Sequence, residues 1–471
     1  MNGQQRVIIE NVQPEINCGE FPVKRVINDR VKIEADIYCD SHDILTAELS
    51  YKFSKDDKWQ TRLMEYDIND RWFASFVVSK IGIWSFSIEA WVDHYKTWHR
   101  DIMIKIDASA DFEIDLLTGA EIIKASLEEY SKIPPEDKAF LKKAEELFSS
   151  ETHLMEERIQ PILDDTLYEV MTKYPVKGHI TKYEKEPLVE VDRNKAIFSS
   201  WYEVFPRSLG KDENNHGTFQ DVISFLPYVT ELGFDVLYLP PIHPIGESKR
   251  KGKNNSTVSE PGEPGSPWAI GGKEGGHKSI HPELGTLDDF KDLIKKASDH
   301  NVEIAMDIAF QCSPDHPWVK EKPQWFRERP DGSLQYAENP PKKYEDIYPL
   351  NFETDDWKNL WEELKSVFLY WIENGVRIFR VDNPHTKSLR FWGWAIREIK
   401  KEYPDVIFLS EAFTRPKVMH QLARQGFTQS YTYFTWRNTK YDITTYCEEL
   451  VNTEVKEFFR PNFWPNTPDI L

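Results

Sequence analysis

From about residue 193 onward, short apolar runs alternate with longer segments whose apolar residues recur at helical intervals. Leu389, Trp392, Ile396 and Ile399 form one such helical stripe. Repeated β–α units with mostly apolar strands predict a parallel α/β architecture, because helices then cover both faces of the sheet. The predicted strands lie at about 198–205, 236–239, 302–308, 376–381, 406–409 and 431–435.

A (β/α)8 TIM barrel fits this segment better than a doubly wound sheet does. No glycine-rich phosphate loop follows the first strand, and polar residues cluster after many strand ends, where barrel active sites are assembled. A closed barrel needs one more strand and helix after the strand-like stretch 462–466, so we predict an incomplete barrel whose last strand is missing. We interpret the chain as a fragment and expect its 471 residues alone to be inactive or poorly stable. Pro227 is expected to interrupt the first barrel helix.

The part of the chain before the barrel is predicted to contain two further segments. Residues 1–108 suggest a β-sandwich, because short strands recur between turn residues and 31–37 alternates apolar and polar side chains. Further strands are expected at 45–53, 71–78, 84–92 and 102–106. Residues 109–192 suggest a helical insert, with a helical pair separated by Pro134 and Pro135. The barrel then occupies 193–471, with an inserted loop subdomain at about 312–352.

Composition excludes several classes of function. The formal net charge of −20 makes the chain a poor partner for nucleic acid or an anionic membrane. No apolar run approaches the length of a membrane span, and the N-terminus has no signal-peptide pattern. The four cysteines are scattered, so we read them as reduced thiols of a cytoplasmic protein. No cluster of His, Cys and Asp indicates a catalytic metal, and no cofactor is predicted.

Two acids follow predicted strands in a way that suits sugar chemistry. Cleavage of a glycosidic bond with retention needs two carboxylates about 5–5.5 Å apart. Strand alternation places Arg380 and Asp382 on one inward face, and the guanidinium favours the ionised carboxylate that a nucleophile requires. Taken alone, a structural Arg–Asp pair is an equally good interpretation. Glu411 follows an apolar strand, where desolvation would raise its pKa as a general acid needs; the alternative is a helix-capping glutamate.

A third acid, Asp469, lies in the stretch Asn466-Thr467-Pro468-Asp469. A carboxylate there can hold sugar hydroxyls and stabilise an oxocarbenium-like transition state, although a turn residue is a strong alternative. Together with Asp307 at the end of the third strand, these segments resemble the α-amylase superfamily in order and spacing. The resemblance implies that Asp382 is the nucleophile, Glu411 the proton donor and Asp469 the transition-state stabiliser.

The chain departs from ordinary amylases at two places. Gln311 and Cys312 stand where most amylases have an Asn-His pair, which puts a calcium site in doubt, and Pro468 replaces the histidine before the stabilising aspartate. These departures, with the stretches 240–246, 250–255, 311–318 and 339–346, resemble the α-1,4-glucan:maltose-1-phosphate maltosyltransferase family. That resemblance implies a retaining glycosyltransferase with an α-maltose 1-phosphate donor and an α-1,4-glucan acceptor, and a homodimer with the sandwich and helical insert at its interface.

The same resemblance implies the substrate contacts. Asn339, Lys342, Tyr344 and Asn383 are expected to face the donor phosphate, which needs cationic and hydrogen-bonding partners. Lys251, Gln311 and Asp346 match contacts to the donor sugar, and Arg380 is counted with the substrate-binding residues. Without the resemblance, the lysines would be read as a solvated loop face. Two alternatives stay open: an α-amylase-like hydrolase acting on α-1,4-glucans, and a non-catalytic glucan-binding protein on the same type of barrel.

Overall fold

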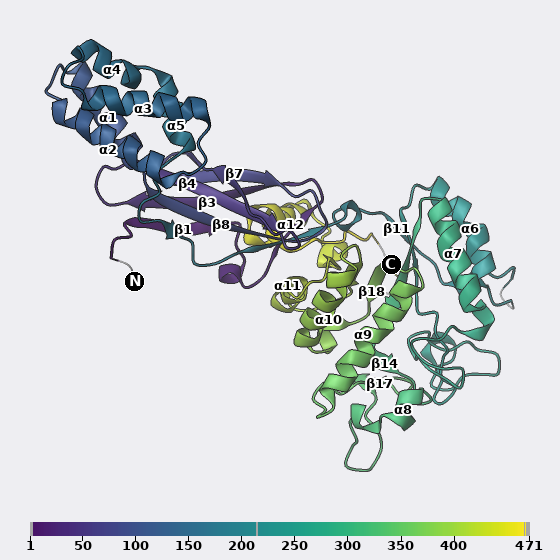
Figure 1. Cartoon of the computed structure of the whole chain (residues 1–471). Coiled ribbons are helices and arrows are strands. Elements are labelled where there is room, and N and C mark those ends of the chain that lie inside the picture. The colour runs from purple at the N-terminus through teal and green to yellow at the C-terminus, as the bar shows by residue number, and fades with distance from the viewer. Residues whose placement is uncertain (1–2, 213–214, 466, 468–471) are drawn as a thin grey trace. The chain divides into compact units, whose positions relative to one another are not determined.

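The computed structural model describes residues 3–212, 215–465 and 467 (Figure 1). By its contacts the chain divides into two compact units. The first comprises 1–20, 30–77 and 84–188, and the second comprises 21–29, 78–83 and 189–471. The predicted Asp469 lies outside the described residues, as does Asn466.

The first unit contains two antiparallel sheets and a group of helices. One sheet has the order β1 (Val7–Gln13), β3 (Arg30–Cys39), β7 (Arg71–Val77) and β6 (Glu65–Tyr66). In the other, β4 (Leu45–Phe53) pairs with β5 (Gln60–Leu63) and β8 (Gly82–Val92), which also pairs with β9 (Thr181–Lys182). Alternate side chains of β3 are buried, and Tyr51 of β4 stacks on Phe76 of β7 at 4.5 Å between ring centroids. The two sheets therefore share an apolar core, as in a sandwich.

The helices of the first unit follow its sheets in the chain. They are α1 (His94–Asp107), α2 (Glu113–Glu129), α3 (Pro135–Ser149), α4 (Met155–Leu163) and α5 (Asp165–Lys173). The strand predicted at 102–106 is wrong, because those residues belong to α1. Asp93 caps that helix by accepting from the Lys96 N–H, and Tyr95, Trp98 and Ile102 recur at helical spacing toward a buried core. The break at Pro134-Pro135 is confirmed, since Pro135 is the first residue of α3.

The second unit is built on a six-stranded parallel sheet. Its order is β11 (Trp201–Glu203), β12 (Val236–Leu239), β13 (Glu303–Ile308), β18 (Ile378–Val381), β19 (Ile407–Ser410) and β20 (Gln429–Ser430). A parallel bridge from Ser430 to Pro461 continues this order. Sequential parallel strands connected by helices are the arrangement of a (β/α)8 barrel. Within the described residues no further strand joins the two ends of this sheet, so the barrel is incomplete.

The barrel helices are α6 (Phe219–Glu231), α7 (Leu287–Asp299), α9 (Trp357–Glu373), α10 (Leu389–Glu402), α11 (Pro416–Arg424) and α12 (Lys440–Asn452), with a short α8 (Pro317–Glu321) in a loop. Loop hairpins pair β14 (Gln311–Cys312) with β17 (Tyr348–Pro349) and β15 (Ala337–Asn339) with β16 (Lys342–Tyr344). Single 3₁₀ turns include Pro206–Leu209, Pro282–Leu284, Pro384–Thr386 and Tyr433–Trp436. The core between sheet and helices contains Phe219, Phe290, Phe368 and Trp392, all fully buried.

Three predicted boundaries in this unit are wrong. Helix α6 continues through Pro227, which lies on the exposed side of the helix. The strand predicted at 431–435 is only Gln429–Ser430, and a 3₁₀ turn occupies Tyr433–Trp436. The strand-like stretch at 462–466 forms no strand in its described part.

A cavity of about 1030 Å³ lies along β11 and residues 461–465, at the open side of the sheet.

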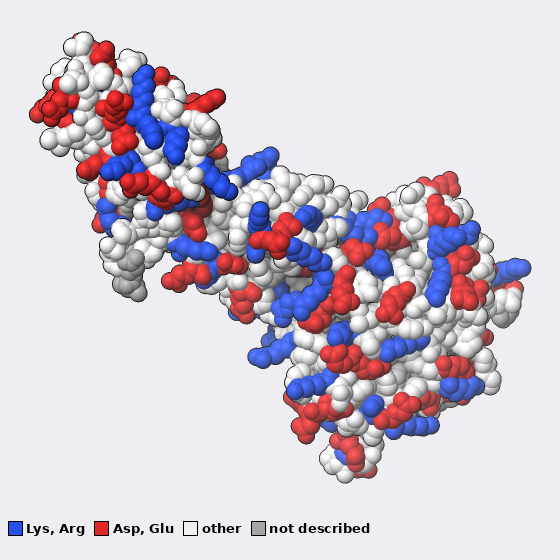
Figure 2. All heavy atoms as spheres, in the orientation of Figure 1, with Lys and Arg blue, Asp and Glu red and all other residues white. Residues whose placement is uncertain are grey.

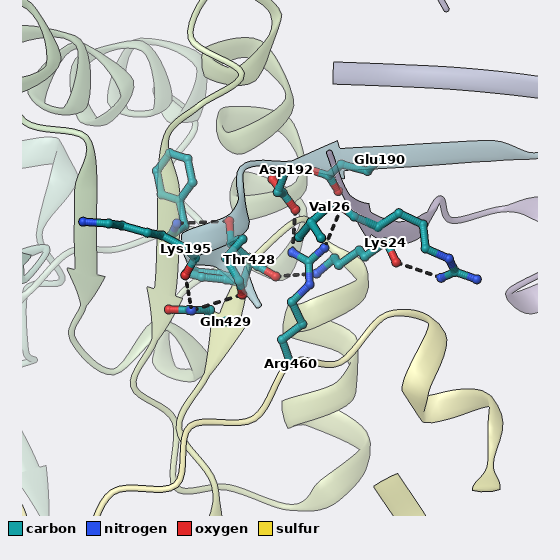
Figure 3. A network of polar contacts seen from close by, with 12 residues as sticks. Lys24, Val26, Glu190, Asp192, Lys195, Thr428, Gln429 and Arg460 are labelled. Atoms are coloured by element: carbon teal, nitrogen blue, oxygen red, sulfur yellow. Dashed lines mark hydrogen bonds and ion pairs between the residues drawn. The ribbon is translucent and has the colours of Figure 1, made fainter. Parts of the chain in front are cut away.

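A buried ionic network lies at the end of the barrel where β11 and β20 begin (Figure 3). Strand β2 (Val23–Val26) pairs in parallel with β10 (Leu188–Asp192). Asp192 accepts from Lys400 at 2.7 Å and from Arg460 at 2.5 Å, and Lys400 also donates to Glu190 at 2.6 Å. The Lys24 ammonium donates to the Ala423 and Phe427 carbonyls. Segments far apart in the sequence are thereby joined through ion pairs and hydrogen bonds of largely buried groups.

Replacing Lys24 by Met is expected to lower the free energy of unfolding by about 3 kcal/mol, because two buried carbonyls and the adjacent carboxylates lose their cation. Urea unfolding at pH 7 measures the change. Lys291→Met on the exposed face of α7 is the control and should change stability by less than about 0.5 kcal/mol.

The difference in stability between the wild type and Lys24→Met should also depend on pH. Burial lowers the pKa of Lys24 to about 7, whereas the unfolded chain keeps the ordinary value near 10.5. Between these values the unfolded state binds more protons, so the stability of the wild type rises with pH relative to Lys24→Met. A constant difference between the two proteins from pH 7 to pH 9 would contradict a buried ammonium that titrates in this range.

Candidate active site

Three of the predicted acids, Asp307, Asp382 and Glu411, lie at the carboxyl ends of parallel barrel strands, whereas Asp469 is outside the described residues. The register pairs Asp307 with Arg380 across β13 and β18, and Val381 with Ser410 across β18 and β19. Asp382 and Glu411 are therefore the first residues after two adjacent strands. Their backbone amides extend the ladder, since Asp382 N–H donates to the Ile308 carbonyl at 2.9 Å and Glu411 N–H donates to the Val381 carbonyl at 3.0 Å. Both side chains are held at the carboxyl end of the sheet, where barrel enzymes assemble their sites.

One guanidinium contacts all three of these carboxylates. Arg380 Nη1 lies 2.8 Å from Asp307 Oδ2 and 2.9 Å from Asp382 Oδ1, and its Nη2 lies 3.8 Å from Glu411 Oε1. All four residues are buried. The Arg380 group also faces the rings of Tyr238 and Tyr431, at 5.8 and 5.7 Å from their centroids. Because Asp382 and Glu411 share this cation, the pair of carboxylates predicted for glycosidic chemistry lies together.

Asn383 also donates a hydrogen bond to each of the carboxylates of Asp382 and Glu411. Its backbone N–H donates to Glu411 Oε2 at 3.0 Å, and its side-chain amide donates to Asp382 Oδ2 at 3.3 Å. This geometry needs a left-handed backbone, with φ of 42° and ψ of 51°, which asparagine tolerates better than most residues. The ammonium of Lys387 donates to the carbonyls of Asp382 and Asn383 at 3.3 and 3.2 Å. Lys387 therefore stabilises the turn that contains Asp382, the candidate nucleophile.

Burial sets the ionisation of the surrounding groups. It raises the pKa of Asp307, an effect that the charge of Asp382 reinforces and the Arg380 charge opposes. The Tyr238 hydroxyl donates to Asp307 Oδ2 at 2.6 Å, whereas Asp307 Oδ1 has no hydrogen-bond partner in the structure. Burial also lowers the pKa of Lys387, and the charges of Asp382 and Glu411 oppose that shift. The site thus combines three buried acids with the buried Arg380 and the half-buried Lys387.

The predicted donor-binding residues form a second group on the barrel loops. Lys251 is buried and its Nζ lies 2.7 Å from Glu345 Oε2. Asp346 is buried beside it, with one carboxylate oxygen unpartnered in the structure and with a pKa raised by burial. Gln311 donates to the Trp268 carbonyl at 3.3 Å. A buried acid with a free oxygen and a half-buried amide are suitable groups for binding hydroxyls.

The remaining predicted phosphate contacts lie on the β15–β16 hairpin. Asn339 and Lys342 pair with each other in its ladder and are exposed, whereas Tyr344 is half-buried. These three residues are not part of the ion-pair network of Arg380. Their phosphate-binding role therefore stays a prediction.

Several site residues were missed by reasoning from the sequence. Tyr238 and Tyr431 enclose Arg380, and Glu345 neutralises Lys251. Lys387 follows Asp382 by five residues, and a cation so close to a candidate nucleophile was the available signal. Tyr238 gave a weaker signal, as a phenol within the apolar strand β12 that needs a polar partner when buried.

Two family models match the sequence. Residues 5–193 match the N/S domain of α-1,4-glucan:maltose-1-phosphate maltosyltransferase, and residues 203–361 match the α-amylase catalytic domain. The enzyme of that first name from Chlorobaculum tepidum is 51% identical over 470 residues, covering 100% of this chain and 69% of its own length. The chain belongs to the α-1,4-glucan:maltose-1-phosphate maltosyltransferase family.

A second relative carries the same maltosyltransferase name. The maltosyltransferase of Methylacidiphilum infernorum is 49% identical over 471 residues, covering 100% of this chain and 70% of its own length. Among solved structures, an α-amylase from Lactobacillus plantarum is 28% identical, with a TM-score of 0.43 over 54% of this chain and 59% of its own. Membership of the family confirms the resemblance seen in the sequence, and it favours maltosyl transfer over the hydrolase alternative.

Replacing Tyr238 by Phe is expected to destabilise this maltosyltransferase fold by about 1–3 kcal/mol, because the buried Asp307 carboxylate loses a hydrogen-bond donor. Thermal unfolding of the variant beside the wild type measures the loss. Tyr228→Phe on the exposed side of α6 is the control. An unchanged midpoint for Tyr238→Phe would mean that Arg380 alone satisfies Asp307.

Proposed function

We propose that this chain carries the catalytic centre of a retaining maltosyltransferase that moves maltosyl units from α-maltose 1-phosphate to the non-reducing ends of α-1,4-glucans. The observation that carries the proposal is the convergence of Asp382 and Glu411 on one guanidinium at the ends of adjacent strands. Family membership supplies the donor and acceptor, which are those that the relatives' names state.

Asp382 acts as the nucleophile in the first half of the reaction. Its carboxylate attacks the anomeric carbon, the bond from that carbon to the phosphate oxygen breaks, and a maltosyl ester of Asp382 forms with release of phosphate. Arg380 and the Asn383 side chain hold the carboxylate through separate oxygens. Because both contacts fix its orientation before the donor arrives, the attack requires little rearrangement.

Glu411 acts as the acid and base. It assists departure of the phosphate, and in the second half it takes the proton of the acceptor 4-hydroxyl while that oxygen attacks the anomeric carbon and displaces Asp382. The Asn383 N–H fixes one oxygen of Glu411. Asp469 would stabilise the oxocarbenium-like transition state. Lys251, Gln311 and Asp346 would bind the donor sugar, and Asn339, Lys342, Tyr344 and Asn383 its phosphate.

We further propose a homodimer in the cytoplasm, with the N-terminal sandwich (residues 1–108) and the helical insert (residues 109–192) at the interface. Exposed apolar side chains of the helical segment support an interface there, among them Ile104, Ile114, Leu117 and Leu154. On the face shown in Figure 2, basic side chains are interspersed with acidic ones, which supports a surface that does not bind nucleic acid. The described helices are each too short or too polar to cross a bilayer.

Phosphate release tests the proposal directly. The protein as its gene encodes it should release phosphate from maltose 1-phosphate when glycogen is added, with elongation of the glucan. Glu411→Gln incubated with the donor should retain a maltosyl group on the peptide containing Asp382, detected by mass spectrometry, and Asp382→Asn should retain none. Starch cleavage without phosphate release would establish the hydrolase alternative.

Lys387→Met should reduce kcat about tenfold or more with little change in KM, because the turn carrying Asp382 and Asn383 loses its fastening while the donor-binding loops are untouched. Lys401→Met, on the exposed side of the following helix, is the control. A raised KM with unchanged kcat would instead place Lys387 among the groups that only bind substrate.

A further inference from the structure

Two clusters of potential metal ligands lie in the described part of the second unit, and the first is closed to a metal. His277, Cys312 and His316 are buried with their ligand atoms within 4.8 Å of one another. His277 Nε2 must carry a proton, because it lies 2.9 Å from the Ala309 carbonyl, and its Nδ1 accepts from His316 Nε2 at 3.0 Å. His316 Nδ1 accepts from the Trp318 N–H. Every ring nitrogen is therefore committed to a hydrogen bond.

The second cluster, His216, His281 and Glu283, differs from the first at His216, whose Nε2 is not used in a described hydrogen bond. Its three ligand atoms also lie within 4.8 Å of one another. His216 Nδ1 donates to the Gly217 carbonyl at 2.7 Å, which leaves the lone pair on Nε2, at 3.9 Å from Glu283 Oε2. A histidine whose other N–H is held by a backbone carbonyl is the usual arrangement of a metal ligand. His216 is thus oriented and in the correct tautomer before any ion arrives.

His281 would have to exchange a hydrogen bond for the ion. Its Nδ1 lies 4.0 Å from Glu283 Oε2 and accepts a long bond of 3.3 Å from the Glu283 N–H. The two imidazole rings are stacked with an interplanar angle of 5° and centroids 5.5 Å apart, so one ring must rotate before both lone pairs point at one ion. Tetrahedral Zn²⁺, with ligand bonds of about 2.0–2.2 Å, separates its ligands by roughly 3.3 Å. From separations of 3.9 and 4.0 Å, ligation therefore needs a ring rotation and a movement of the mostly exposed Glu283 side chain.

We propose that His216, His281 and Glu283 form a binding site for a divalent transition-metal ion, with Zn²⁺ as the reference ion and solvent completing its coordination. Two imidazoles and a carboxylate suit Zn²⁺ better than Ca²⁺ or Mg²⁺. Burial lowers the pKa of His281, so its ring is neutral at physiological pH. Of the neighbouring charges, Glu274 favours the ion and Arg250 opposes it.

The site joins two loops at the carboxyl end of the barrel. His216 lies between β11 and α6, while His281 and Glu283 lie between β12 and α7, in the connection that also contains Lys251. A bound ion would restrain both loops without contact to Asp382 or Glu411. Its effect is therefore on the order of the loops and on thermal stability, and it does not depend on the proposed transferase reaction.

Metal titration tests the site. After treatment with a chelator, the protein as its gene encodes it should bind Zn²⁺ in calorimetry, and bound Co²⁺ should give the visible absorption of low-coordinate cobalt. His216→Ala, His281→Ala and Glu283→Gln should each weaken Zn²⁺ binding at least tenfold, whereas His300→Ala, at the end of α7, should not. The melting temperature of the wild type should rise by a few degrees with Zn²⁺, and those of the three variants should not.

The outcomes separate clearly. Absence of Zn²⁺ binding to the wild type, or equal binding by the wild type and the three variants, would overturn the site. If a histidine variant fails to fold, the wild-type protein still decides, because anomalous scattering from Zn²⁺-soaked crystals must place the ion between His216 and His281. Density for zinc elsewhere, with none there, would also overturn it.

Discussion

The site depends on a single buried cation placed among three carboxylates. Arg380 contacts Asp307, Asp382 and Glu411, and without it three desolvated acids would face one another. Like charges brought together in a desolvated site repel one another, and the guanidinium offsets that repulsion. Arg380 also contacts Asp382 at 2.9 Å and so helps to orient the proposed nucleophile.

The flat geometry of the guanidinium explains why arginine occupies this position. Its Nη1 serves Asp307 and Asp382 on neighbouring strands, while Nη2 faces Glu411, so the fork spans three adjacent strand ends. An ammonium is a point charge on a flexible stem and cannot fix three directions at once. The phenols of Tyr238 and Tyr431 complete the enclosure, with ring faces that favour a cation. Sheet register sets these positions, since Asp307 lies 73 residues before Arg380 in the sequence but pairs with it across β13 and β18.

Much of this could be predicted from the sequence, for identifiable reasons. Arg380 and Asp382 are two residues apart in a strand, so alternation alone places them on one face, and the structure joins them at 2.9 Å. The parallel arrangement followed from buried apolar strands that alternate with amphipathic helices. The contact of Glu411 with Arg380 was not predicted, because no local pattern reports the register between β18 and β19.

What could not be predicted depends on tertiary contacts. The segment 102–106 has alternating apolar residues that suit a strand, but Asp93 caps a helix and the burial of Trp98 and Ile102 decides for it. Pro227 was expected to break a helix that in fact tolerates it on an exposed face. Lys24 carried no signal at all, because its partners are backbone carbonyls some 400 residues away. Every residue has a backbone carbonyl, so a contact between a lysine and a distant carbonyl can be found only from the structure.

Charged groups are buried at both ends of the barrel, but their partners differ. Where the strands begin, Lys24, Lys400 and Arg460 are matched closely by Glu190, Asp192 and carbonyl groups, and every contact there is short. Such an arrangement resists change and fixes the scaffold. Where the strands end, Glu411 keeps a looser contact of 3.8 Å with Arg380, and Asp382 divides its oxygens between Arg380 and Asn383. The proposed chemistry lies at this end of the sheet, where Arg380 and Asn383 each contact both carboxylates.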